Sequence, residues 1–370
     1  MWIAIIAALL TVSASGILYI SFRAANFSFV KRLSGGRRWL GRLACFVFFS
    51  ALLAVLWLTM NMWNALVCTV HLVLFWLIGD MIALIYRKAA SRPKKKYIAG
   101  AVSAALCVLY LAVGWFLAHH VFVVSYRFES EKLDGNVRIV QITDSHVGAT
   151  FHADGFLEHI KEINEYKPDA VVVTGDFVDD DTTREDMIGS CDALGELETK
   201  YGVYFICGNH DKGYYSEAAK GWTNAEFRER LLENGVILLE DSSVLVDGRF
   251  YIVGRQDRSE EQRGSSRLTA GEIMEDVDRS KFVLMLDHQP YDFDAEAEAG
   301  ADLVLCGHTH GGQFIPITHV GEWTGENCLR YGYERRENTD FIVSSGISNW
   351  TFKFKTGCHS EFVVIDITGK

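Results

Sequence analysis

Five short motifs between residues 144 and 312 gather side chains that could bind metal ions and transfer protons. They are Asp144-Ser145-His146, Gly175-Asp176-Phe177-Val178-Asp179, Gly208-Asn209-His210-Asp211, Asp287-His288-Gln289-Pro290 and Gly307-His308-Thr309-His310-Gly311-Gly312. One such motif alone is a weak indication. Five in one chain, several of them after runs of strand-forming residues, predict a single site on loops at strand ends. Carboxylate and imidazole ligands without thiolates favour hard or borderline divalent ions.

The motifs also indicate a reaction class. Two metal ions roughly 3.5–4 Å apart activate water and neutralise phosphoryl oxygens, and they need a shared ligand. Asp176 is the natural shared ligand, because a carboxylate has two oxygens and this one follows a tight glycine turn. The Asn209 amide can coordinate a metal ion while His210 stays free. With Asp211 beside it, His210 could be held protonated and could protonate a leaving alkoxide.

The elements that must position these motifs alternate between strand and helix patterns. Apolar runs predict strands near residues 137–142, 170–173, 203–207, 236–239, 243–246, 250–253, 282–286, 301–306, 341–344 and 361–367. Helical spacing predicts helices near 154–166, 184–199 and 224–234. We therefore expect an α/β fold of two packed mixed sheets flanked by helices. The charged segment 254–271 is expected to be an exposed loop near the site.

The charges divide the chain into two parts. Residues 1–125 hold 12 Lys and Arg and one acid, a net charge of +11. Residues 126–370 hold 24 Lys and Arg and 46 acids, a net charge of −22. This division predicts a basic membrane anchor, 1–125, followed by an acidic enzyme domain, 126–370. The acidic domain argues against nucleic acid as a partner, because clustered Lys and Arg bind phosphate backbones.

Four apolar stretches predict an all-α transmembrane region. Each is near the ~20 residues that cross a ~30 Å hydrocarbon layer, and they lie at 2–22, 43–61, 65–86 and 98–124. The basic residues gather in the loops 23–42 and 87–96, which the positive-inside rule places on the cytoplasmic face. With four spans, the protein would be an integral, multi-pass protein of the cell membrane with its catalytic domain outside the cytoplasm.

Asp80 is the only acidic residue in the four apolar stretches. Ionisable residues inside a membrane are functional candidates by default, which leaves a channel or a lipid-binding bundle as one interpretation. We favour a passive anchor in which Asp80 lies near a helix end, close to Arg87 and Lys88, and either snorkels to the interface or is paired.

The eight cysteines contain no Cys-x-x-Cys motif, which argues against a zinc ribbon or a redox motif. Cys207 and Cys306 end apolar runs and are expected to be buried packing residues. Cys328 and Cys358 could form a disulfide in an oxidising compartment.

The motif set resembles that of the calcineurin-like metallophosphoesterase superfamily over about residues 136–367, above all in the run Gly307-His308-Thr309-His310-Gly311-Gly312-Gln313. It looks most like the membrane-associated, YkuE- and YaeI-like bacterial branch. The resemblance implies one metal ion bound by Asp144, His146, Asp176 and His310, and a second bound by Asp176, Asn209, His288 and His308. It further implies that His210, assisted by Asp211, is the general acid and that metal-activated hydroxide attacks phosphorus. The two ions would be Mn, Fe, Zn or similar divalent metals.

The chain departs from this branch at two positions. Ser145 stands where Leu is common, with little expected effect. Lys355 stands where a C-terminal Arg is usual, and a point charge cannot bind phosphate through two parallel hydrogen bonds as a planar guanidinium can. This second difference bears on the substrate and not on the metal ligands.

Several other residues have two interpretations each. Asp179 could orient a metal ligand or cap the following helix, and Arg255 and Asp257 could contact substrate or lie in an exposed loop. His152 and His159 are expected to be solvated. Four aromatic residues could form a platform for a lipid or a base, or could serve packing or membrane-interface seating; they are Trp323, Tyr331, Tyr333 and Trp350.

The expected function is that of a membrane-anchored, dinuclear metal-dependent phosphoesterase. Its substrate would be a phospholipid, a lipid-linked pyrophosphate or an envelope phosphodiester, with membrane lipids as partners. One alternative is the same hydrolase acting on soluble extracytoplasmic phosphoesters. The other is a membrane protein that senses metal or phosphate without turnover. The pair His210-Asp211 argues against the last, because a binding module does not need a general acid.

Overall fold

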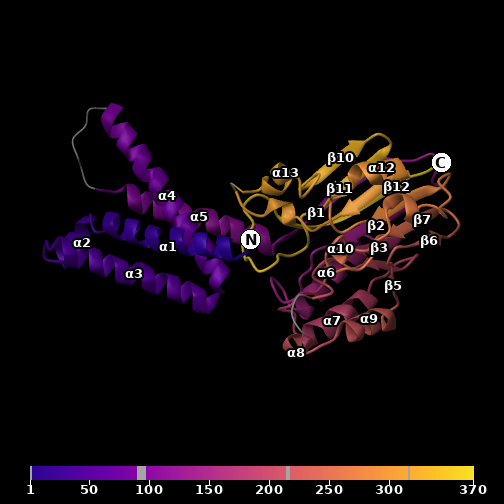
Figure 1. The fold of residues 1–370 in the computed structure, drawn as a ribbon, viewed down its shortest axis with the longest axis horizontal. Coiled ribbons are helices and arrows are strands. Elements are labelled where there is room, and N and C mark those ends of the chain that lie inside the picture. The colour runs from indigo at the N-terminus through magenta and orange to yellow at the C-terminus, as the bar shows by residue number, and fades with distance from the viewer. Residues whose placement is uncertain (1, 90–96, 214–216, 316) are drawn as a thin grey trace. The chain divides into compact units, whose positions relative to one another are not determined.

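The chain forms two units, Met1–Gly114 and Trp115–Lys370, in the computed structural model drawn in Figure 1. Long apolar runs are typical of the first unit, and alternating strand and helix patterns are typical of the second. The structure describes residues 2–89, 97–213, 217–315 and 317–370.

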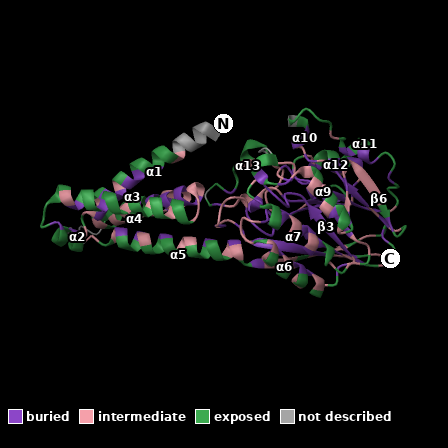
Figure 2. Ribbon diagram, turned by 90° about the horizontal axis from the view of Figure 1, so that it is seen from below, coloured by how far each residue is buried: buried purple, intermediate pink, exposed green. Residues whose placement is uncertain are grey.

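The first unit is helical, and it contains α1 (Trp2–Ala24), α2 (Ser28–Leu33), α3 (Arg38–Thr59), α4 (Met62–Ala89) and the greater part of α5 (Ala99–His119), whose last residues belong to the second unit. Three of them, α3, α4 and α5, are long and apolar enough to cross a membrane by length and composition. The segment Leu9–Ala24 of α1 is a shorter apolar helix, so a fourth span stays a prediction. Most side chains of α3 are exposed, as a lipid-facing helix requires (Figure 2).

Asp80 is paired, and its partner is distant in sequence. Its carboxylate accepts two hydrogen bonds from the Arg23 guanidinium, at 2.5 and 2.7 Å. The hydroxyls of Tyr19 and Tyr97 donate to the same carboxylate, at 2.5 and 2.8 Å. The sequence placed Asp80 close to Arg87 and Lys88, whereas the packing of α1 against α4 supplies the cation.

The second unit contains two six-stranded sheets, with strand orders β1-β12-β2-β3-β4-β5 and β10-β11-β9-β8-β7-β6. The strands are β1 (Val121–Glu129), β2 (Val137–Ile142), β3 (Ala170–Thr174), β4 (Val203–Ile206), β5 (Val236–Leu238), β6 (Ser242–Val246), β7 (Phe250–Gly254), β8 (Phe282–Leu286), β9 (Leu303–Cys306), β10 (Gly332–Arg336), β11 (Thr339–Val343) and β12 (Ser360–Thr368). The pairs β12–β2, β10–β11 and β6–β7 are antiparallel and the others are parallel. The predicted pair of mixed sheets is confirmed.

Helices cover the outer faces of both sheets. They are α6 (Ala153–Glu165), α7 (Arg184–Gly195), α8 (Glu217–Lys220), α9 (Asn224–Glu233), α10 (Ser259–Gln262), α11 (Ala270–Ile273), α12 (Phe293–Ala299) and α13 (Val320–Thr324), with a short 3-10 turn at His310–Gly312. Successive strand residues point to opposite faces. Ile139 therefore packs between the sheets with Leu284, whereas Val140 packs outward in the same cluster as Phe156 of α6.

Two strands were not predicted. The apolar stretch 98–124 is divided, because α5 ends at His119 and β1 begins at Val121. β1 pairs in parallel with β12 from Val121 to Glu129, so the sheet starts before residue 126, where we expected the domain to begin. β10 has the sequence Gly-Tyr-Glu-Arg-Arg, which is too polar for an apolar pattern to reveal an edge strand.

Asp186 connects two helices of this unit, and its removal should weaken the fold in a pH-dependent way. Its carboxylate accepts from the Ala153 N–H at 3.0 Å and the Thr183 hydroxyl at 2.8 Å, and it lies 3.0 Å from His152 Nδ1. Burial acts to raise the pKa of Asp186, but these donors outweigh it and the pKa is lowered. Asp186→Asn should therefore cost about 1–2 kcal/mol at pH 7.

This stabilisation is complete above the ordinary carboxyl pKa of about 4 and is lost as the pH falls through the lowered pKa of the folded state. Thermal unfolding of the full chain in detergent between pH 3 and 7 measures it. The variant and the parent should converge in acid. Glu185→Gln, an exposed neighbour, is the control and should show no such difference. A pH-independent cost for Asp186→Asn would contradict the assignment.

Candidate functional site

The five motifs lie at the carboxyl ends of five strands, three in one sheet and two in the other. Asp144, Asp176 and Asn209 follow the parallel neighbours β2, β3 and β4. His288 and His308 follow the parallel neighbours β8 and β9. Because parallel strands end at the same edge of a sheet, each sheet contributes one row of side chains.

Hydrogen bonds between the two rows join the sheets at this edge. The Gln141 side chain of β2 donates to the Cys306 carbonyl at 2.9 Å. The His308 N–H donates to the Asp144 carboxylate, 2.9 Å from Oδ2. His288 Nδ1 lies 2.8 Å from the Thr174 carbonyl oxygen. Side chains from motifs more than 100 residues apart in sequence are therefore held in one place.

Two groups of three side chains could each hold a metal ion. One consists of Asp144, His146 and His310, and the other of Asp176, His288 and His308; within each group the ligand atoms lie within 4.8 Å of one another. Asp176 Oδ2 is 3.1 Å from His288 Nε2 and 3.7 Å from His146 Nε2, so this carboxylate touches both groups. A ligand shared by two ions would need such a position.

The imidazole nitrogens show that these groups suit a cation. A carbonyl oxygen only accepts, so His288 Nδ1 must donate to Thr174. His288 Nε2 then faces Asp176 Oδ2 at 3.1 Å without a well-aligned hydrogen bond. Among the residues that the structure describes, buried nitrogens of His146, His308 and His310 also lack a hydrogen-bond partner. Buried polar atoms are normally satisfied, and divalent ions would satisfy these.

The electrostatics agree with this interpretation. Burial alone would lower the pKa of His288, but the Asp176 carboxylate raises it well above its ordinary value. Burial and the charge of His288 lower the pKa of His308 to about 4. Burial likewise lowers the pKa of His310. The site therefore attracts positive charge beside Asp176 and keeps two imidazoles in the neutral form that binds metals.

Five of the candidate ligands have strained backbones. Their φ angles lie between +36° and +69°, a region that residues other than glycine rarely adopt. The five residues are Asp144, His146, Asp176, His308 and His310. Each such residue costs roughly 1–3 kcal/mol and persists where function requires it. Gly208 also serves the site, because a Cβ there would lie 2.3 Å from Asp176 Oδ1.

Asp211 braces the loops that carry the site. Its Oδ2 accepts hydrogen bonds from the N–H groups of Asp176 and Gly208, at 2.9 and 2.7 Å. Its Oδ1 accepts from the N–H groups of Phe177 and Val178, at 2.8 and 3.1 Å. Burial raises the pKa of Asp211 to about 7 despite these donors. The carboxylate thus positions the Asp176 turn against the Asn209-His210 turn.

His210 lies at the side of the two groups. Its backbone N–H donates to Asp176 Oδ1 at 2.8 Å, and its ring is 5.0 Å from the ring of His146. The Trp350 ring packs against it at 5.2 Å between centroids. Burial lowers the pKa of His210.

Asp179 and Asp257 support their motifs from the side. Asp179 Oδ2 lies 3.3 Å from His146 Nδ1, which directs His146 Nε2 toward Asp176. Thr183, and not Asp179, caps α7. Asp257 accepts from the Gln289 side chain at 3.0 and 3.1 Å and is buried.

Arg255 is buried beneath the His288 motif. Its guanidinium donates to Asp287 at 2.8 Å, to Glu296 at 3.0 Å and to Asp292 at 3.1 Å. Arg267 also binds Asp287. The expectation of an exposed loop at 254–271 is wrong at its start, where Arg255 and Asp257 fold inward because they meet buried partners that are distant in sequence.

Lys355 binds the backbone of a neighbouring loop. It is fully buried and donates to the backbone carbonyls of Ser345 and Gly346, at 2.7 and 3.3 Å. A Cβ at Gly346, whose φ is +80°, would lie 2.6 Å from the Asp144 Cβ. Lys355 therefore fixes the loop that packs behind Asp144.

The other cysteines, aromatic residues and histidines that the sequence singled out each have contacts of their own. Cys328 and Cys358 are free thiols that donate to the carbonyls of Tyr291 and His310. Tyr331 donates to Glu361 and Tyr333 to Asp340, whereas the ring of Trp350 packs on His210. His152 is mainly exposed, whereas His159 packs against Phe151.

Residues 137–312 match the family model described as calcineurin-like phosphoesterase. An uncharacterized metallophosphoesterase of Campylobacter jejuni is 30% identical over 67% of this chain and 63% of its own length. One from Aquifex aeolicus is 28% identical over 72% of this chain and 98% of its own. A transmembrane protein with metallophosphoesterase domain from Danio rerio is 29% identical over 64% of this chain and 54% of its own. The chain therefore spans less than two thirds of two of these relatives.

Proposed function

Because residues 137–312 belong to the calcineurin-like phosphoesterase family, a group of phosphoester hydrolases, we propose that this chain is a membrane-anchored phosphoesterase with two metal ions. One ion would be held by Asp144, His146, Asp176 and His310, and the other by Asp176, Asn209, His288 and His308. Bound there, the ions would supply activated water and neutralise phosphoryl charge.

The chain's own residues would complete the reaction. His210 is a candidate to donate a proton to the leaving oxygen, because it lies beside both metal groups and belongs to neither. Trp350 packs on its ring and limits its movement. Asp179 orients His146, and Asp211 holds the Asp176 turn in place. The observation that carries the proposal is the contact of Asp176 with an imidazole of each group.

The experiment is hydrolysis of bis(p-nitrophenyl) phosphate by the full chain in detergent. The chelated protein should be inactive, and Mn, Zn or Fe should restore turnover as about two ions bind per chain. Mg alone should do less, because it prefers oxygen ligands and the site offers four imidazoles. Two bound ions without turnover of any phosphoester would favour a sensing role.

For the substrate, we propose a phosphoester embedded in a lipid bilayer. The end of the candidate membrane helix α5 is held by the loop that borders the site. Ala118 O accepts from the Ser360 hydroxyl at 2.8 Å and from the Asn349 side chain at 3.4 Å. The residue after Asn349 is Trp350, which packs on His210. A short series of contacts through Asn349 and Trp350 thus connects the end of α5 to His210, the candidate proton donor.

An apolar surface continues from this loop. Phe352 packs on Phe314 at 5.1 Å, and four described residues after Phe314 are exposed although apolar. These exposed apolar residues are Ile315, Ile317, Val320 and Trp323, and Trp323, on α13, is 75% exposed. Both views place α13 at one end of this unit (Figures 1 and 2). Exposed apolar side chains of this kind suit the bilayer interface.

The double variant Ile317→Ser with Trp323→Ser should separate lipid from soluble substrates. Burial of each side chain in lipid contributes roughly 1.5–3 kcal/mol, so turnover of a phospholipid in nanodiscs should fall at least about tenfold. Turnover of bis(p-nitrophenyl) phosphate should stay unchanged. Leu232→Ser, a similarly exposed residue on α9, is the control. Hydrolysis of soluble phosphoesters alone by the parent would instead support the extracytoplasmic soluble substrate.

A further inference from the structure

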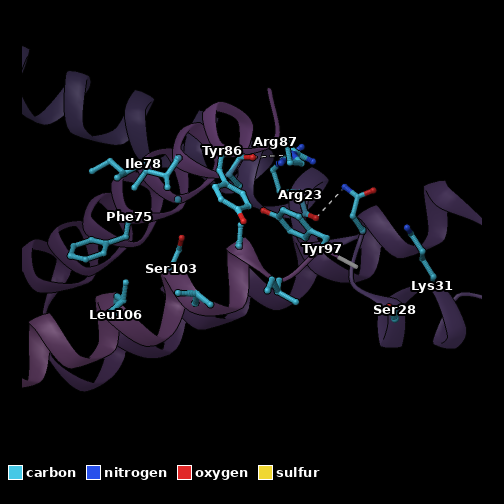
Figure 3. A pocket seen from close by; sticks show the side chains of 17 residues that line it. Arg23, Ser28, Lys31, Phe75, Ile78, Tyr86, Arg87, Tyr97, Ser103 and Leu106 are labelled. Carbon is cyan, nitrogen blue, oxygen red and sulfur yellow. Dashed lines mark hydrogen bonds between the residues drawn. The ribbon is translucent and has the colours of Figure 1, made fainter. Parts of the chain in front are cut away.

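The first unit contains a cavity of about 890 Å³ lined by α1, α2, α4 and α5. Its lining changes from apolar to basic along its length. Figure 3 shows Phe75, Ile78 and Leu106 at one end and Lys31 at the other, with Arg23, Arg87 and Tyr97 between them. The cavity is therefore amphipathic, and it belongs to the helices and not to the metal site.

The basic part of the cavity has an excess of positive charge. None of its described lining residues is acidic, while Arg23, Lys31 and Arg87 all line it. Asp80, the one acid nearby, does not line the cavity, and its carboxylate is bound by Arg23, Tyr19 and Tyr97. Even with Arg23 paired to Asp80, two further cations remain. Unbalanced cations in a low-dielectric setting favour an anionic ligand.

The apolar part is shaped for hydrocarbon. Phe75, Ile78 and Ile82 from α4 face Val102 and Leu106 from α5 across it. The two helices approach closely beside it, because Gly79 has no side chain where a Cβ would meet the Ser103 hydroxyl at 2.0 Å. Small residues commonly allow such close approach between membrane helices. The cavity of about 890 Å³ is within the range of roughly 300–1,000 Å³ of ligand pockets.

We propose that this cavity is a binding site for one anionic phospholipid. Arg23, Lys31 and Arg87 would hold the phosphate, and the acyl chains would lie along the apolar part. The basic end is formed where α1 and α4 end and α5 begins, which the positive-inside rule assigns to the cytoplasmic face. Anionic lipids of that leaflet bind basic pockets between membrane helices. The proposal is independent of the reaction proposed for the metal site.

The test is lipid binding by the full chain in a neutral detergent, measured by native mass spectrometry. Phosphatidylglycerol should bind as one molecule per chain, at least tenfold more tightly than phosphatidylcholine with the same acyl chains. Inorganic phosphate should not bind at the same concentration, because it lacks the chains. Equal retention of the two lipids would overturn the role of the basic residues, and tight binding of free phosphate would overturn the role of the apolar part.

Matched variants locate the site. Lys31→Ala with Arg87→Ala should remove the preference for phosphatidylglycerol. Arg32→Ala with Lys88→Ala changes the charge equally at adjacent residues that do not line the cavity, and should keep the preference. Equal loss in both variants would show general surface attraction and overturn the proposal. Ile82→Trp, which fills the apolar part without changing charge, should also prevent binding; retention of the lipid in this variant would likewise overturn it.

Discussion

Asp176→Asn should reduce phosphodiester turnover about 10³-fold or more, the scale on which loss of a preorganised electrostatic group acts. The asparagine amide is the same size as the carboxylate, but it would present an NH₂ group to a metal cation where the carboxylate presents an anionic oxygen. Asp176 Oδ2 is the atom that lies 3.1 Å from His288 Nε2 and 3.7 Å from His146 Nε2. The variant should therefore also bind fewer than two metal ions, measured by elemental analysis of the purified full chain.

Asp179→Asn is the matched control for this variant. It is also a buried carboxylate, but His146 is the one candidate ligand described beside it, at 3.3 Å from Oδ2, and its Oδ1 accepts from the Asp181 N–H at 2.9 Å. Loss of such a supporting group typically costs roughly 10–100-fold in metal affinity or activity. The two variants should thus differ both in turnover and in metal content. An Asp176→Asn protein that keeps two ions and a rate within tenfold of the parent would contradict the shared-ligand role.

The sequence predicted the parts of this site that depend on local patterns. Ala170-Val171-Val172-Val173 is a short apolar run of mostly β-branched residues, and it forms the fully buried β3. A run of this kind ends where polar residues begin, so Asp176 could be placed at a strand end from sequence alone. The same reasoning placed His288 after β8 and His308 after β9.

Partners that are distant in sequence could not be predicted in this way. Arg255 meets Asp287 and Glu296, 32 and 41 residues away, and a charged run gives no sign of which residue it will pair with. Arg23 and Asp80, 57 residues apart, are a second example. β1 was hidden for a different reason, since Val121 and the residues after it continue an apolar run, and hydropathy alone does not separate helix from strand.

Asp211 joins two turns of the site through its carboxylate, and Asp211→Asn should destabilise the domain. All four hydrogen bonds described for its carboxylate come from backbone N–H groups. An asparagine offers one oxygen, so its NH₂ group would face two N–H donors in either orientation. Two buried donors left without acceptors cost roughly 1–3 kcal/mol each. We expect the unfolding free energy to fall by about 2–4 kcal/mol and metal affinity to fall with it.

Comparison with His210→Ala decides how Asp211 acts. The contact of His210 with Asp176 Oδ1 is made by the backbone N–H, so this variant should keep its stability and both ions. It should lose more rate on an alkyl ester than on a p-nitrophenyl ester, because a poor leaving group depends more on protonation. If Asp211→Asn gave the same pattern, Asp211 would act through His210, as the sequence suggested. Thermal unfolding, metal content and the two substrates together separate that outcome from the one expected here, in which the Asp176 turn loosens and both esters are affected alike.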